Sequence, residues 1–167
     1  MAQKNLCRSE TPKERIDLAE LIEEVLSELL CLTMLRNVVV RSELREELWI
    51  DGVVATWRAL VSSLLDGIVK AVPSGSRIVV RNEIIDGKSS LRFIIRSNMH
   101  AAQSHLQAHI IANLGIVVAA ELAEQSDSCV SMEQEDDGVV FAILMPQPSE
   151  HWRAPLESQE TVINPQS

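Results

Sequence analysis

The stretch SLLDGIVKAVPSG at residues 63–75, followed by SRIVV at residues 76–80, places the end of a helix directly before a strand. Apolar residues recur at helical spacing from about Val53 to Val72, which predicts a helix with one buried face. Pro73-Ser74-Gly75 ends this helix, because proline and glycine do not continue it. The β-branched residues that follow predict a strand over Arg77–Ile85.

Outward from this junction, the chain alternates short helices and strands. An amphipathic helix is predicted from about Ile16 to Leu30, with glutamates on its outer face. Asp86-Gly87 is a strong hairpin signal between two strands. Two helical stretches are expected within residues 100–125, broken near Asn113-Leu114-Gly115. The remaining strands are predicted over Asn37–Leu44, Glu47–Asp51, Ser90–Ser97, Ser128–Gln134 and Val139–Met145.

This order of elements predicts the fold class α+β, as a two-layer α/β sandwich. One mixed sheet is expected, covered on one face by helices, so that its other face is left to solvent or to a partner. We expect a flexible N-terminus over residues 1–15, one folded domain over 16–146 and a disordered tail over 147–167. Trp152 in that tail is either a docking anchor or, in the simpler interpretation, an unused aromatic residue.

The composition excludes several classes of function. The chain has 167 residues and a formal net charge of −9, so it lacks the basic balance that a binder of the nucleic-acid backbone needs. We expect no membrane span and no secretory signal, because no apolar run is long enough. Cys7, Cys31 and Cys129 lack the spacing of a metal or disulfide motif, which favours thiols in a reducing cytoplasm. Cys31 and Cys129 are expected to be small core residues.

Residues 63–75 closely resemble the N-box of the GHKL (Bergerat-type) ATPases, in particular that of the catalytic ATP-binding domain of bacterial sensor histidine kinases. The family pattern is N-L-L-x-N-A-x-K-Y-T-P-x-G, followed by a strand. Residues 114–122 resemble the start of a later helix of the family, 138–146 resemble its last strand, and Ile16-Asp17-Leu18 resembles its opening. The resemblance spans residues 16–146 in order, and it implies the two-layer fold of that family.

Several nucleotide-binding positions of this family carry other residues here. The resemblance implies that the second asparagine of the N-box binds Mg²⁺, and Gly67 stands at that position without a side-chain ligand. Ser63 replaces the first asparagine. Asp66 cannot substitute, because successive helix residues point about 100° apart, and it is expected to be a solvated acid. Ser97 stands where an aspartate of the family accepts a hydrogen bond from adenine, and Met99 replaces a glycine.

The phosphate-binding glycines of the family are also reduced. Asn113 replaces the first of them and Gly115 remains, while the lid of the family is shortened to Ala101–Ala112. We assign no catalytic residue and no metal ligand. The vestigial nucleotide pocket implied by the resemblance consists of Gly67, Lys70, Ser97, Asn98 and Gly115.

Three histidines fall in one predicted helical stretch: His100, His105 and His109. The last two are four residues apart, a spacing that could bind zinc, but no Glu base or further ligand accompanies them. They could also accept a phosphoryl group, although the acceptor motif of the histidine kinases is absent from the first 15 residues. Partly exposed helix histidines are the simpler interpretation.

The sequence therefore favours a degenerate histidine-kinase-like ATPase domain. We expect a pseudokinase that serves bacterial signal transduction as a protein-interaction or regulatory module, without Mg-ATP catalysis. The alternative is an active ATP-dependent protein kinase, of the histidine-kinase or anti-sigma-factor type, with a divergent site.

The expected partner is a signalling protein: a response regulator, a kinase or a sigma-factor regulator. A homodimer is a further option, and neither nucleic acid nor membrane is expected. The acidic face of the first helix and the uncovered face of the sheet are candidate contact surfaces. No cofactor is expected, and binding of ATP or ADP without strong Mg²⁺ dependence stays open.

Overall fold

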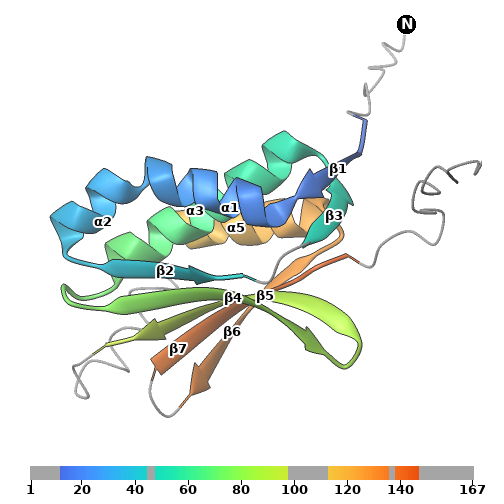
Figure 1. Cartoon of the computed structure of the whole chain (residues 1–167). Coiled ribbons are helices and arrows are strands. Elements are labelled where there is room, and N and C mark those ends of the chain that lie inside the picture. The colour runs from blue at the N-terminus through green and yellow to red at the C-terminus, as the bar shows by residue number, and fades with distance from the viewer. Residues whose placement is uncertain (1–11, 45–47, 98–112, 136–137, 147–167) are drawn as a thin grey trace, which may run out of the picture.

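The main sheet holds five strands in the order β2-β4-β5-β7-β6 (Figure 1). The computed structural model describes residues 12–44, 48–97, 113–135 and 138–146. β2 and β4 are parallel, and the other neighbouring pairs are antiparallel, so the sheet is mixed as predicted. The strands are β2 (Val39–Glu43), β4 (Arg77–Ile85), β5 (Lys88–Arg96), β6 (Cys129–Glu135) and β7 (Gly138–Leu144).

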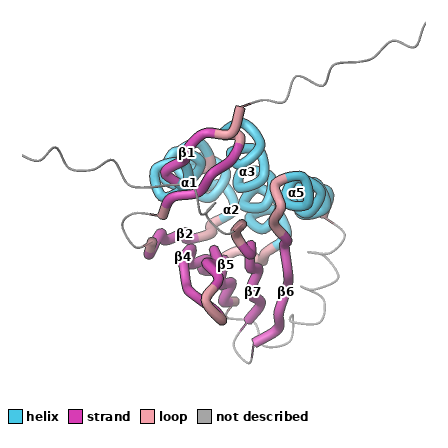
Figure 2. Tube along the Cα trace, turned by 90° about the vertical axis from the view of Figure 1, so that its right-hand side faces the viewer, coloured by secondary structure: helices cyan, strands magenta, loops and turns pink. Residues whose placement is uncertain are grey.

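Four described helices lie over one face of this sheet (Figures 1 and 2). They are α1 (Leu18–Glu28), α2 (Leu30–Arg36), α3 (Val54–Ala71) and α5 (Leu114–Gln125). Alternate residues of the strands, such as Phe93 and Ile95 on β5, point to the helices and are fully buried. They pack in one hydrophobic core with apolar residues of α3, among them Leu64 and Ile68. The expected α+β two-layer sandwich is therefore confirmed.

A second, two-stranded sheet lies beside the helices. Only one of its strands was predicted, over Glu47–Asp51, and that strand was expected in the main sheet. β1 (Glu14–Asp17) pairs antiparallel with β3 (Trp49–Gly52), and Ile16 stands opposite Ile50. Both isoleucines are buried, while the Arg15 guanidinium lies 4.7 Å from the centre of the Trp49 ring. The strand begins at Glu14, so the expected flexible N-terminus over residues 1–15 does not hold for its last residues.

The first predicted helix divides into two at Leu29. Asp17 caps α1, because its carboxylate accepts hydrogen bonds from the backbone N–H groups of Ala19 and Glu20. α2 was missed, and the core position expected for Cys31 on this helix is wrong: its side chain is exposed. Cys129 on β6 is exposed as well, so that expectation is also wrong.

The acidic outer face of α1 is only partly a solvated surface. Arg58 on α3 forms ion pairs with Glu24 and Glu28, and its Nη1 lies 2.7 Å from the Glu28 carboxylate. These pairs tie α1 to α3 at the surface.

The helix predicted over Val53–Val72 and the strand over Arg77–Ile85 match α3 and β4 within one residue. Among the described helices, none is long and apolar enough to cross a bilayer. The predictions for residues 1–11, the three histidines, the lid and the tail with Trp152 lie outside the described residues.

Candidate functional site

Two residues of the pocket that the resemblance implies, Gly67 and Gly115, lie where α3 and α5 cross. Gly67 on α3 is buried, and the Cα of Gly67 would lie 3.2 Å from a Cβ added at Gly115 on α5. That added Cβ would also lie 2.7 Å from the backbone oxygen of Ser63, one turn earlier on α3. The two glycines thus let the backbones approach more closely than any side chain would allow. The structure brings Gly67 and Gly115 together, as parts of a helix packing contact.

The space beside Gly67 is occupied by side chains of α5 and its cap. A Cβ added at Gly67 would lie 2.8 Å from Asn113 Oδ1 and 3.0 Å from Ile116 Cγ1. Asn113 caps α5, because its Oδ1 accepts a hydrogen bond of 2.9 Å from the backbone N–H of Gly115. This cap was missed from the sequence, where Asn113 counted only as a lost glycine. The Asx cap motif directly before an apolar helix was the available signal.

Lys70 is engaged by a neighbour on its own helix. Its Nζ lies 2.7 Å from Asp66 Oδ2, one turn earlier on α3. Asp66 is therefore a half-buried partner of Lys70, rather than the purely solvated acid expected. The pair is largely exposed, so it stabilises α3 by well under about 1 kcal/mol. The ion pair nevertheless holds the Lys70 ammonium, which is the cationic group of the predicted pocket, beside Asp66 on the same helix.

Ser97 directly follows β5 at the edge of the described structure. It is partly buried, and Asn98 after it lies outside the described residues. The last residue of β5, Arg96, pairs with Gly138, the first residue of β7. A Cβ at Gly138 would clash with the backbone oxygen of Ile95, so this end of β5 is fixed by close backbone packing. Ser97 offers a hydroxyl where the resemblance implies a carboxylate.

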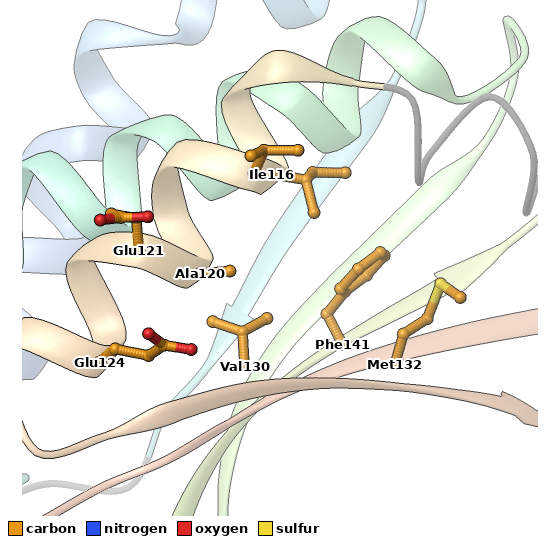
Figure 3. Close-up of a pocket in the computed structure, with 8 residues that line it drawn as sticks. Ile116, Ala120, Glu121, Glu124, Val130, Met132 and Phe141 are labelled. Atoms are coloured by element: carbon orange, nitrogen blue, oxygen red, sulfur yellow. The ribbon is translucent and has the colours of Figure 1, made fainter.

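A cavity of about 340 Å³ lies on the other side of α5, between this helix and the strands β6 and β7 (Figure 3). Its walls are mainly apolar, with Ile116 and Ala120 from α5 facing Val130, Met132 and Phe141 from the sheet. Glu121 and Glu124 stand on the α5 side of this cavity. The sequence did not single out any of the sheet residues that line it.

The face of the main sheet away from the four described helices carries arginines and glutamates, and also Ile94 and Val140, which are buried there. On β5, the Arg92 guanidinium lies 2.9 Å from Glu83 and 2.8 Å from Glu135. The hydrogen bond that Arg92 donates to Glu83 raises the pKa of Arg92 above its usual value; burial opposes this shift, and the charges of Glu83 and Glu135 add to it. This face is thus only partly charged.

No group of three metal-binding side chains is found within the residues that the structure describes. The described residues of the predicted pocket are thus Lys70, which is paired with Asp66, the hydroxyl-bearing Ser97, and the start of α5, which Asn113 caps.

Restoring the family asparagine at Gly67 is expected to destabilise the protein. Gly67→Asn places a Cβ against Asn113 and Ile116, and overpacking of this kind costs about 1–3 kcal/mol. Urea unfolding measures the loss. Ala59→Asn is the matched control, because it adds the same side chain at an exposed position of α3 and is expected to cost only about 0.5 kcal/mol. Equal losses in the two variants would contradict the tight crossing.

No protein-family model matches this chain, and no curated protein matches it either. Solved structures with a similar fold include histidine kinases. The nucleotide-free catalytic domain of histidine kinase ThkA is 16% identical with a TM-score of 0.66, and the alignment covers 83% of this chain and 99% of that chain. The mycobacterial sensor histidine kinase MprB is 16% identical with a TM-score of 0.61, over 81% of this chain and 98% of that chain.

A third neighbour is a crystal structure of ThkA in complex with the response regulator protein TrrA. It is 17% identical with a TM-score of 0.63, and the alignment covers 80% of this chain and 41% of that chain. The chain therefore has the fold of the catalytic ATP-binding domains of sensor histidine kinases, as the resemblance implied.

Proposed function

We propose that this chain is a pseudokinase: a histidine-kinase-type domain that serves bacterial signalling in the cytoplasm by binding a protein partner, without Mg-ATP catalysis. The observation that carries this proposal is the packing at Gly67. The family places an oxygen ligand for Mg²⁺ there, whereas here the position has no side chain and Asn113 and Ile116 fill the space beside it. A Mg²⁺ ion needs oxygen ligands in near-octahedral arrangement, and this position supplies none.

The remaining described positions support the same proposal. Lys70 is paired with Asp66, and the backbone N–H of Gly115 in the first turn of α5 donates to Asn113. A phosphate would have to displace both contacts before it could bind at the helix start. The described helices and strands nevertheless share one continuous hydrophobic core. A domain that keeps its core while its nucleotide contacts are replaced is suited to binding another protein.

The proposed partner is a response regulator or another signalling protein. The support is the neighbour in which ThkA is bound to a response regulator. The acidic face of α1 and the uncovered sheet face are the surfaces that the proposal assigns to contact, with a homodimer as an alternative use of either.

Thermal unfolding with ATP and with ADP, each with and without Mg²⁺, tests the absence of Mg-ATP binding. A nucleotide at 100 times its Kd stabilises the folded state by about 2.7 kcal/mol, and we expect no such shift with Mg-ATP. Gly67→Ala is the control for Gly67→Asn in the same measurement, because alanine crowds the contact between α3 and α5 without adding an oxygen ligand for Mg²⁺. Saturable Mg-ATP binding at micromolar Kd would overturn the proposal and favour the active kinase.

A further result of this unfolding experiment, and the results of two other experiments, also bear on the proposal. A shift with ATP or ADP that does not depend on Mg²⁺ keeps the pseudokinase proposal and adds a nucleotide ligand. Phosphoryl transfer from labelled ATP to a purified receiver domain would establish the kinase alternative. Binding of such a receiver domain in the absence of nucleotide is the result that the proposal expects.

A further inference from the structure

Three arginines line a hollow at one end of the uncovered sheet face. They are Arg41 on β2, Arg77 on β4 and Arg96 on β5, three neighbouring strands, and all three side chains are exposed. Arg77 and Arg96 stand directly opposite each other in the antiparallel register. The hollow has a volume of about 150 Å³ and is also lined by Val39, Val79 and Glu43. We call this site the arginine hollow.

The other arginines of the same face have carboxylate partners. Arg92 contacts Glu83 and Glu135, and Arg81 Nη2 lies 2.6 Å from Glu83 Oε1. Across the described ranges of the chain, by contrast, neither Arg41, Arg77 nor Arg96 forms an ion pair with a carboxylate. Among the residues that the structure describes, unpaired positive charge is therefore concentrated at one end of this face, on a chain whose net charge is −9.

The facing pair Arg77 and Arg96 carries a cost in the free protein. Like charges directly opposite each other on neighbouring strands repel, and a bound anion removes this repulsion. The three arginines contribute +3 and Glu43 contributes −1, so the lining carries a formal charge of about +2. A doubly charged anion matches this charge.

We propose that the arginine hollow binds a phosphate-type dianion, either free phosphate or the phosphate of a monoester. Each guanidinium can donate two parallel N–H bonds to the oxygens of such a group, and arginine is the side chain best suited to this contact. The hollow is well below the 300–1,000 Å³ of pockets that enclose whole ligands, so it accommodates an anionic group and leaves the remainder of a ligand outside. The site lies on the opposite side of the sheet from α3 and α5, on the face that the proposed function also assigns to partner contact, but it rests on none of the observations at Gly67, Lys70 and Asn113.

Thermal unfolding at constant ionic strength tests this proposal, with inorganic phosphate, glycerol phosphate or the dicarboxylate succinate exchanged for chloride. Constant ionic strength is needed because general screening also changes with salt. Phosphate is expected to raise the Tm of the natural chain by about 2 °C or more, the size that a stabilisation near 1 kcal/mol gives. A shift with both phosphates identifies free phosphate as a sufficient ligand, and one with glycerol phosphate alone identifies an esterified phosphate.

Arg77→Gln and Arg96→Gln are expected to abolish the phosphate shift. Arg58→Gln is the matched control, because it removes the same charge from an exposed site on the helical side and should leave the shift intact. Without phosphate, Arg77→Gln is further expected to raise the Tm, since the facing like charge is removed. Equal phosphate shifts in all variants, no phosphate shift at all, or an equal shift with succinate would overturn the proposal.

Discussion

Replacing Trp57 with alanine is expected to lower the free energy of unfolding by about 3–5 kcal/mol. Trp57 lies on α3, is 1% exposed and belongs to the main hydrophobic core. Its ring packs on Gly52 of β3, where an added Cβ would lie 2.7 Å from Trp57 Cδ1. Truncation therefore removes the contact that joins the small β1–β3 sheet to α3, as well as a large buried surface.

Urea unfolding of Trp57→Ala, followed by circular dichroism, measures this loss. Trp57→Phe is the matched variant, since it keeps an aromatic ring in the core and is expected to cost less than half as much. A loss of about 4 kcal/mol is a large part of the 5–15 kcal/mol that typically separates folded from unfolded domains. A Trp57→Ala variant within 1 kcal/mol of the natural chain would show that β1 and β3 are anchored elsewhere.

Replacing Gly138 with alanine is expected to cost about 3 kcal/mol, at the upper end of the range for overpacking. The added Cβ would clash with the backbone oxygen of Ile95 on the neighbouring strand. Backbone cannot move aside as a side chain does, so β7 has to shift away from β5 along its first residues. The pairing of Gly138 with Arg96, at the end of β5 before Ser97, is the contact expected to open.

Gly87→Ala is the matched control for Gly138→Ala. Gly87 lies in the β4–β5 turn with a φ of 75°, and nothing stands within 4 Å of its added Cβ. Its substitution therefore carries only the cost of a left-handed backbone, about 1 kcal/mol. Chemical denaturation of both variants separates the two effects, and similar losses would argue against the close approach at Gly138.

The helices and strands of the central core could be predicted because each has strong local signals. α3 has a long apolar face followed by Pro73-Ser74-Gly75, and β4 and β5 are joined at Asp86-Gly87. The β1–β3 pair could not be predicted in this way. Each of its strands has four residues, and its pairing joins segments that are more than 30 residues apart in the chain. Short strands of this kind are specified by tertiary packing on Trp57, which leaves no periodic pattern.

The candidate site, too, could be predicted only in part. The resemblance placed Gly67 and Gly115 in one pocket, and the structure shows these two residues in contact. That Asn113 fills the space beside Gly67 depends on a side-chain direction that the sequence does not give. The four-residue spacing of Asp66 and Lys70 on a predicted helix was, by contrast, an available signal for their ion pair. Both exposed cysteines were misplaced because an apolar neighbourhood in the chain does not fix which side of a helix or strand is buried.

The contact between α3 and α5 also constrains how this domain can change over evolutionary time. An asparagine at position 67 is disfavoured while Asn113 and Ile116 keep their present places, so its introduction is favoured only after other substitutions. Each of those earlier changes would weaken a capped and well-packed helix start without any gain in nucleotide binding. Under the proposed function, an asparagine at position 67 therefore becomes tolerable mainly together with changes at its neighbours, in the manner of a ratchet.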